Sequence, residues 1–206
     1  MKQVLIIECS PRGSESASRQ LTARLRERLK TQYPQAKFID RDLTKGEIPH
    51  LDQEAVTAFT KPGGIGGAIR LSDQLIDELL GSDLLVIGTP MWNFGIPSSL
   101  KAWIDHVVRA GKTFNYNGAK VDGLATGKKA VLVLASGGVF TKDPWKSWDF
   151  VEPYLRQILA FIGIADIQIV RAEGLNVPNL APQAIPNGEK AIDSLLLGHK
   201  ETCSIT

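Results

Sequence analysis

The sequence has few of the residues that build disulfide frameworks, zinc sites or acid–base centres. Its 206 residues include two cysteines, Cys9 and Cys203, and three histidines, His50, His106 and His199. Two cysteines with no spacing pattern are too few for a disulfide framework or a structural zinc site. The histidines are scattered, so we predict neither a bound metal nor a catalytic side chain. We expect His106 on the surface of its helix and Cys9 in the interior.

Long apolar runs and a large excess of charge are also absent. No segment approaches the ~20 apolar residues of a membrane helix, and the run at residues 4–7 is too short for a signal peptide. The net charge is +2, and the basic residues of segment 24–30 are interrupted by Glu27, which favours a solvated helix face. We therefore predict a soluble, cytoplasmic protein with no nucleic-acid and no membrane partner.

Short apolar runs alternate along the chain with longer segments of helical period. Continuous runs typical of strands buried on both faces occur at residues 4–7, 84–88 and 130–134, with weaker ones at 37–40 and 167–170. Apolar stripes of helical spacing lie at residues 21–29, 71–80, 100–108, 151–162 and 191–196. This alternation predicts an α/β fold, with a five-stranded parallel sheet covered by helices on both faces.

Proline, glycine and asparagine predict where elements begin and end. Residues 42–68 contain several prolines and glycines, so we expect a long surface loop with at most one helical turn. Pro97 is expected to open one helix that Gly111 ends, and Asn187 to cap a last helix that ends at Gly198. We predict one domain over residues 1–198 and a disordered tail over 199–206.

Three loops leave the same edge of such a sheet, where ligands of doubly wound folds bind. The first, residues 9–18, includes Ser10, Ser16, Ala17 and Ser18 and leads into a helix, whose N-terminus can bind a phosphate. It has neither a P-loop lysine nor a dinucleotide fingerprint. Its hydroxyls suit a terminal monophosphate, as in FMN, although a serine-rich turn with a helix cap explains the loop about equally well.

The second loop, residues 89–97, follows the apolar run at residues 84–88. It presents Met91, Trp92, Asn93 and Phe94 in succession at the ligand-binding edge. We predict that these apolar side chains pack around a flat heteroaromatic ring while backbone groups near Asn93 bind its polar edge. The alternative is a turn whose side chains only fill the core.

The third loop places Ser136, Gly137 and Gly138 directly after a strand. Glycine allows the backbone to approach a ligand closely, although a tight turn would also explain the pair. Three such loops at one edge favour a ligand site.

These segments together resemble the FMN-dependent NADH-azoreductases and the related flavodoxin-like NAD(P)H:quinone oxidoreductases. Further matching motifs lie at residues 109–114, 127–130 and 161–164. The resemblance implies a flavodoxin-like three-layer sandwich of strand order 2-1-3-4-5. By resemblance, the FMN-binding residues are Ser10, Ser16, Ala17, Ser18, Met91, Trp92, Asn93, Phe94, Ser136, Gly137 and Gly138.

The resemblance also implies an activity. Two electrons would pass from NADH or NADPH through bound FMN to a quinone or azo compound, by a ping-pong mechanism in which FMN does the redox chemistry. A homodimer with the site at its interface is implied, with Phe114, Tyr116, Trp145 and Trp148 lining the substrate pocket. This chain departs from the family in having Trp92 in place of tyrosine and no arginine near Ser136, which affects contacts at the ring edge and acceptor preference.

Two other functions remain open at this stage. The first is a flavodoxin-type FMN electron carrier that reacts with protein partners, although such carriers usually present a strongly acidic face. The second is a flavodoxin-like scaffold that binds partners without flavin.

Overall fold

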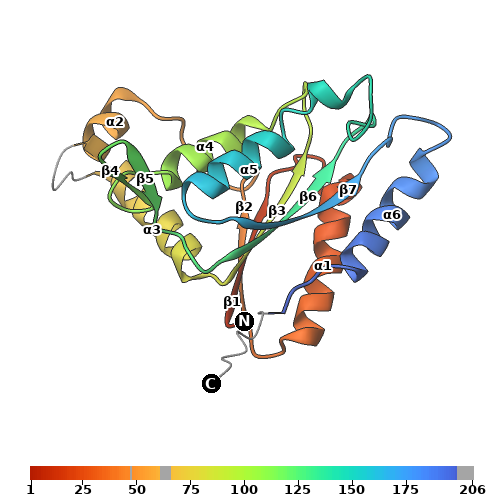
Figure 1. Cartoon of the computed structure of the whole chain (residues 1–206), viewed down its shortest axis with the longest axis horizontal. Coiled ribbons are helices and arrows are strands. Elements are labelled where there is room, and N and C mark those ends of the chain that lie inside the picture. The colour runs from red at the N-terminus through yellow and green to blue at the C-terminus, as the bar shows by residue number, and fades with distance from the viewer. Residues whose placement is uncertain (47, 61–65, 199–206) are drawn as a thin grey trace.

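A five-stranded parallel sheet forms the centre of the computed structural model, which describes residues 1–46, 48–60 and 66–198 (Figure 1). The strands lie in the order β2-β1-β3-β6-β7, and every neighbouring pair is parallel. Counting only these five strands, this is the predicted order 2-1-3-4-5. Their bounds are β1 Gln3–Glu8, β2 Lys37–Asp42, β3 Leu84–Pro90, β6 Lys129–Ala135 and β7 Asp166–Ala172.

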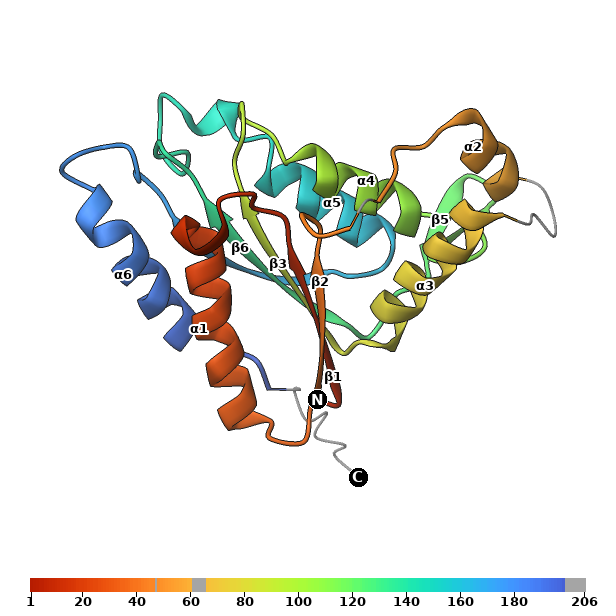
Figure 2. The same ribbon diagram turned by 180° about the vertical axis from the view of Figure 1, so that it is seen from behind.

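Helices cover both faces of the sheet, as expected (Figures 1 and 2). On one face, α1 and α6 pack through Leu21, Leu25 and Ile192 against alternate strand residues such as Val4 and Val86. The other face carries the remaining long helices, α3, α4 and α5. The bounds are α1 Ala17–Gln32, α3 Gly67–Gly81, α4 Ser98–Val107, α5 Glu152–Phe161 and α6 Ala181–Asp193.

The register of the sheet brings the carboxyl ends of its strands to one edge. Glu8 of β1 lies opposite Gly88 of β3, and Ala135 of β6 lies opposite both Pro90 and Ala172. Since four strands end almost level, the loops after β1, β3, β6 and β7 leave side by side. This is the geometric basis of the site described below.

The prediction for residues 42–68 was wrong in one respect. Residues 53–60 form an eight-residue helix, α2 Gln53–Thr60, rather than at most one turn. Asp52 explains its start, because its carboxylate accepts a hydrogen bond from Ala55 N at 2.7 Å. Ala55 is the residue of this helix that is buried.

Two further boundaries differ from the prediction. The last helix begins at Ala181, six residues before Asn187, because prolines are tolerated in its first turn and Pro186 is accommodated inside the helix. Helix α4 begins at Ser98 and ends at Val107, so Pro97 lies just before it and Gly111 lies beyond its end.

A β-hairpin was not predicted. Strands β4 Phe114–Asn117 and β5 Lys120–Gly123 pair antiparallel outside the main sheet. Most of their residues are exposed and polar, so they give no apolar run in the sequence. The hairpin contacts α5 and lies on the opposite side of the molecule from α6 (Figure 1).

Among residues 1–46, 48–60 and 66–198, no helix combines the length and apolar character needed to cross a bilayer. The predicted tail, residues 199–206, lies outside the described residues.

Candidate functional site

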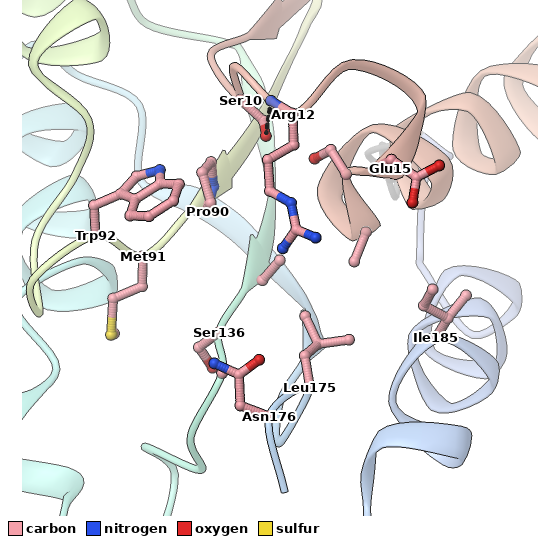
Figure 3. Close-up of a pocket in the computed structure, with 14 residues that line it drawn as sticks. Ser10, Arg12, Glu15, Pro90, Met91, Trp92, Ser136, Leu175, Asn176 and Ile185 are labelled. Carbon is pink, nitrogen blue, oxygen red and sulfur yellow. Dashed lines mark hydrogen bonds between the residues drawn. The ribbon is translucent and has the colours of Figure 1, made fainter. Parts of the chain in front are cut away.

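A cavity of about 280 Å³ opens where the loops after β1, β3, β6 and β7 meet (Figure 3). One side is the N-terminal end of α1 with its preceding loop, and the other is the segment that follows β3. The cavity is lined by Ser10, Arg12, Glu15, Ser16, Ala17, Pro90, Met91, Trp92, Ala135, Ser136, Gly137, Leu175, Asn176 and Ile185.

The α1 side of the cavity is rich in hydrogen-bonding groups. Ser16 caps α1 by accepting from Arg19 N at 3.4 Å, and its hydroxyl lies 3.0 Å from that of Ser18. The Ser10 hydroxyl is nearly inaccessible and accepts from Arg12 N at 3.4 Å. Figure 3 shows the Arg12 guanidinium extending into the cavity. Hydroxyls, a helix N-terminus and a guanidinium are groups that can bind a phosphate.

An ion pair fixes this loop to the sheet. Arg19 donates from Nε to Ser10 O at 2.9 Å, and its guanidinium binds both Asp42 carboxylate oxygens at 3.0 and 2.7 Å. Burial alone would raise the pKa of Asp42, but hydrogen bonds from Arg19 and Thr44 outweigh it and lower the pKa to about 2. The loop is therefore fixed in place at neutral pH.

The opposite wall is a strained turn. Trp92 and Gly95 exchange both backbone hydrogen bonds at 2.9 Å, so Asn93 and Phe94 occupy its two central positions. Their φ angles are 47° and 69°, and they are the only residues other than glycine with positive φ in the described part of the chain. Asparagine tolerates this conformation, but phenylalanine adopts it rarely and at a cost. The surrounding contacts must hold the turn.

The far end of the cavity contains two loops rather than the one predicted. Asn176 N donates to Gly137 O at 2.9 Å, and Leu175 N donates to Ser136 O at 3.2 Å. A Cβ atom on Gly137 would lie 2.4 Å from Asn176 Nδ2, so any other residue here would displace the Asn176 side chain. Sequence reasoning missed the loop after β7, although its strand ends at the same edge and the same rule would have included it.

The structure brings most, but not all, of the predicted residues to the cavity. Seven of the eleven predicted cofactor residues line it, namely Ser10, Ser16, Ala17, Met91, Trp92, Ser136 and Gly137. Ser18, Asn93, Phe94 and Gly138 do not line it; Ser18, Asn93 and Gly138 directly adjoin residues that do, and Phe94 is two residues from Trp92. The lining residues that were not predicted are Arg12, Glu15, Pro90, Ala135, Leu175, Asn176 and Ile185.

The four predicted substrate-pocket aromatics do not line the cavity of their own chain. Phe114 and Tyr116 lie on the β4–β5 hairpin, where Phe114 packs against Phe161 with ring centroids 4.7 Å apart. Trp148 and Trp145 are nearer the site, because Trp148 packs edge-on against Phe94 at 4.9 Å.

Glu8, Cys9 and His106 lie outside the cavity lining; Glu8 is partly buried and the other two are buried. Burial raises the pKa of Glu8 to about 7 and that of Cys9 to about 12, and Cys9 is 1% exposed, as predicted. The prediction for His106 was wrong, because this residue is fully buried. Its Nε2 lies 3.0 Å from Pro49 O, and its ring packs edge-on against Phe59 of α2. Because α2 was not predicted, the burial of His106 against it was not predicted either.

The cavity fits FMN better than it fits a metal ion. The described residues contain no group of three or more histidine, cysteine, aspartate or glutamate side chains that could hold a metal. The polar α1 end suits a phosphomonoester, while Met91 and Trp92 offer apolar surface to a flat ring. Ser136, Gly137 and Asn176 provide polar atoms at the opposite end.

Comparison with known proteins identifies the class. The model of the flavodoxin-like fold family matches residues 2–196. The chain is 57% identical over 202 residues to an FMN-dependent NADH:quinone oxidoreductase of Beijerinckia indica, covering 96% of this chain and 100% of that protein. A protein of the same name from Azotobacter vinelandii is 46% identical over 182 residues, which cover 86% of this chain and 90% of that one.

A solved structure agrees with these relatives. An FMN-dependent NADH-azoreductase of Bacillus anthracis in complex with FMN superimposes with a TM-score of 0.83 at 28% identity, covering 94% of this chain and 98% of that one. The chain therefore belongs to the flavodoxin-like family that includes the FMN-dependent NADH:quinone oxidoreductases and azoreductases. This confirms the resemblance drawn from the loop motifs.

Proposed function

We propose that this chain is an FMN-dependent NADH:quinone oxidoreductase that also reduces azo compounds. The observation that carries the proposal is the cavity, which combines a phosphate-binding helix end with an apolar turn at the carboxyl edge of a flavodoxin-like sheet. The 57% identity to an enzyme of this name supports it. When bound, FMN supplies the two-electron chemistry, so the protein needs to orient its substrates and shield them from water.

The loop residues would divide the binding of FMN among them. The Ser10, Ser16 and Ser18 hydroxyls and the first N–H groups of α1, including that of Ala17, would hold the phosphate, at roughly 1.5–3 kcal/mol for each hydrogen bond to the charged group. The ring would lie against Met91, Trp92, Asn93 and Phe94. Its polar edge would face Ser136, Gly137 and Gly138.

The substrate pocket would need a second copy of the chain. Tyr116 is 70% exposed on a hairpin outside the cavity lining, so it could approach the site of another subunit, with Phe114, which is 8% exposed, packed beneath it. The cavity of one chain, about 280 Å³, is at the lower end of the size range of ligand pockets. We therefore propose a homodimer with the site at its interface, Trp145 and Trp148 completing the pocket. One FMN-binding domain over residues 1–198 and a cytoplasmic location remain predictions.

An absorption experiment tests this function. The purified protein is supplied with FMN, its visible spectrum is recorded, and NADH is then added without oxygen. Bound flavin that bleaches within seconds and recovers on adding a quinone or azo dye is the expected result. Bound flavin that stays oxidised with NADH and NADPH would favour the electron-carrier alternative, and no bound flavin would refute the proposal.

A further inference from the structure

An aromatic cluster lies beside the cavity. Phe94 of the strained turn packs against Phe140 at 6.1 Å and Trp148 at 4.9 Å, and Trp148 packs against Trp145 at 5.4 Å, all near edge-on. Both tryptophans are about half exposed. The cluster therefore joins the turn after β3 to the segment 140–150, which we call the aromatic segment.

A single arginine holds the aromatic segment at both ends. Arg171, on edge strand β7, donates to Asp149 Oδ2 at 2.7 Å and to the Glu152 carboxylate at one end. It also contacts Glu173 Oε1 at 3.4 Å. Glu173 accepts hydrogen bonds from Phe140 N at 2.8 Å and the Thr141 hydroxyl at 2.7 Å, at the other end.

These contacts are largely shielded from water. The side chains of Arg171 and Glu173 are both 14% exposed, and that of Asp149 is 7% exposed. Asp149 also caps α5, accepting from Val151 N at 2.9 Å. Three carboxylates gathered around one guanidinium would repel one another without it, so the cluster depends on Arg171.

The aromatic segment is also hydrogen-bonded to the strained turn after β3. Phe150 N donates to Phe94 O at 3.1 Å, at a residue whose φ of 69° needs support from outside the turn. Displacement of Asp149 would move Trp148 and loosen Phe94 together. The arginine is thus connected through packed contacts to the wall of the cavity.

We propose that Arg171 is a positioning residue for the electron acceptor, holding the aromatic segment so that Trp145 and Trp148 can stack on a flat aromatic acceptor. The proposal rests on the function proposed above. It predicts that acceptors that bind by stacking depend on Arg171, whereas small inorganic acceptors do not.

Arg171→Met and Arg171→Lys test the proposal. The first removes the charge, and the second keeps it without the planar fork that binds several carboxylates. Arg156→Met is the matched control, since Arg156 binds the same Glu152 through Nε at 2.6 Å but contacts neither Asp149 nor Glu173. Steady-state kinetics are measured on the FMN-loaded proteins with a naphthoquinone and with ferricyanide, alongside the Kd for FMN.

The expected result is a KM for naphthoquinone raised about 5- to 10-fold in Arg171→Met, the size of one lost aromatic contact, and less in Arg171→Lys. The kinetics with ferricyanide, the Kd for FMN and all values for Arg156→Met stay within about 2-fold. Hydrogen exchange of residues 140–150, measured without FMN, should accelerate in the Arg171 variants only.

Three outcomes would overturn the proposal: an unchanged KM for naphthoquinone in Arg171→Met, equal losses with both acceptors, or unchanged hydrogen exchange. If Arg171→Met does not fold, Arg171→Lys decides. Failure of the proposed function is distinguishable, because it would appear in the wild-type protein as absent flavin binding or absent bleaching by NADH.

Discussion

Glu8 should make the protein less stable as the pH rises towards neutrality. Its Oε2 atom is buried with no hydrogen-bond partner among the described residues. Burial, only partly opposed by the Thr22 hydroxyl and Arg19, raises the pKa of Glu8 from 4.5 to about 7. The folded state therefore keeps a proton that the unfolded chain releases, and the stabilising contribution is complete below pH 4.5 and lost as the pH rises through 7.

The pKa difference sets the size of the effect. A rise from 4.5 to about 7 corresponds to at most about 3 kcal/mol of unfolding free energy. Glu8→Gln has nearly the same shape and no charge, so we expect it to lose this pH dependence and to gain stability relative to wild type at pH 8. Urea unfolding at pH 5, 6, 7 and 8, without FMN, measures the difference at each pH.

Glu189→Gln is the control, because Glu189 is exposed on α6. It should leave the pH profile unchanged. If the profile of Glu8→Gln runs parallel to that of the wild type, then Glu8 is ionised in the folded protein at no cost, and the reasoning from burial is refuted.

Three further predictions concern the turn, a close backbone contact and the buried thiol. Asn93→Ala should weaken FMN binding about 5-fold in a binding titration, because alanine tolerates a positive φ poorly. Asn93→Gly should retain FMN binding, because the turn acts through its backbone. Equal losses of affinity in the two variants would instead indicate a direct role of the Asn93 side chain. Gly123→Ala should destabilise the fold by roughly 2–4 kcal/mol in urea unfolding, because its Cβ would lie 2.3 Å from the backbone N of Gly163. Gly67→Ala, with no described atom within 4 Å of the added Cβ, should be neutral or stabilising. In Cys203→Ser protein, Cys9 should react with iodoacetamide only after denaturation, as mass spectrometry would show; rapid reaction of the native protein would contradict its burial.

Local patterns in the sequence carried much of the fold. Continuous apolar runs identified the three central strands β1, β3 and β6, because a strand buried on both faces is mostly apolar. The edge strands β2 and β7 gave weaker signals, because polar residues interrupt them. The same patterns failed for the β4–β5 hairpin, whose residues are mostly exposed. They also failed for α2, where a short helix lies within a segment rich in glycine and proline, and with it for His106, which α2 covers.

Part of the site was also predictable from local sequence. Ser16, Trp92 and Gly137 were each identified by residue type at the end of a predicted strand, and all three line the cavity. Asn176 was missed, because the rule was not applied to the loop after β7; the tertiary structure brings this residue to Gly137.

The tertiary structure alone decided which distant groups act together. Residue type and spacing set local conformation and which face of an element is apolar, since these depend on neighbours along the chain. Other features depend instead on segments far apart in sequence. These are the ion pairs of Arg171 with Asp149 and Glu173, the positive φ of Phe94 and the burial of the Glu8 carboxyl group. Their energies come from contacts and desolvation that exist only once the sheet and its loops have assembled.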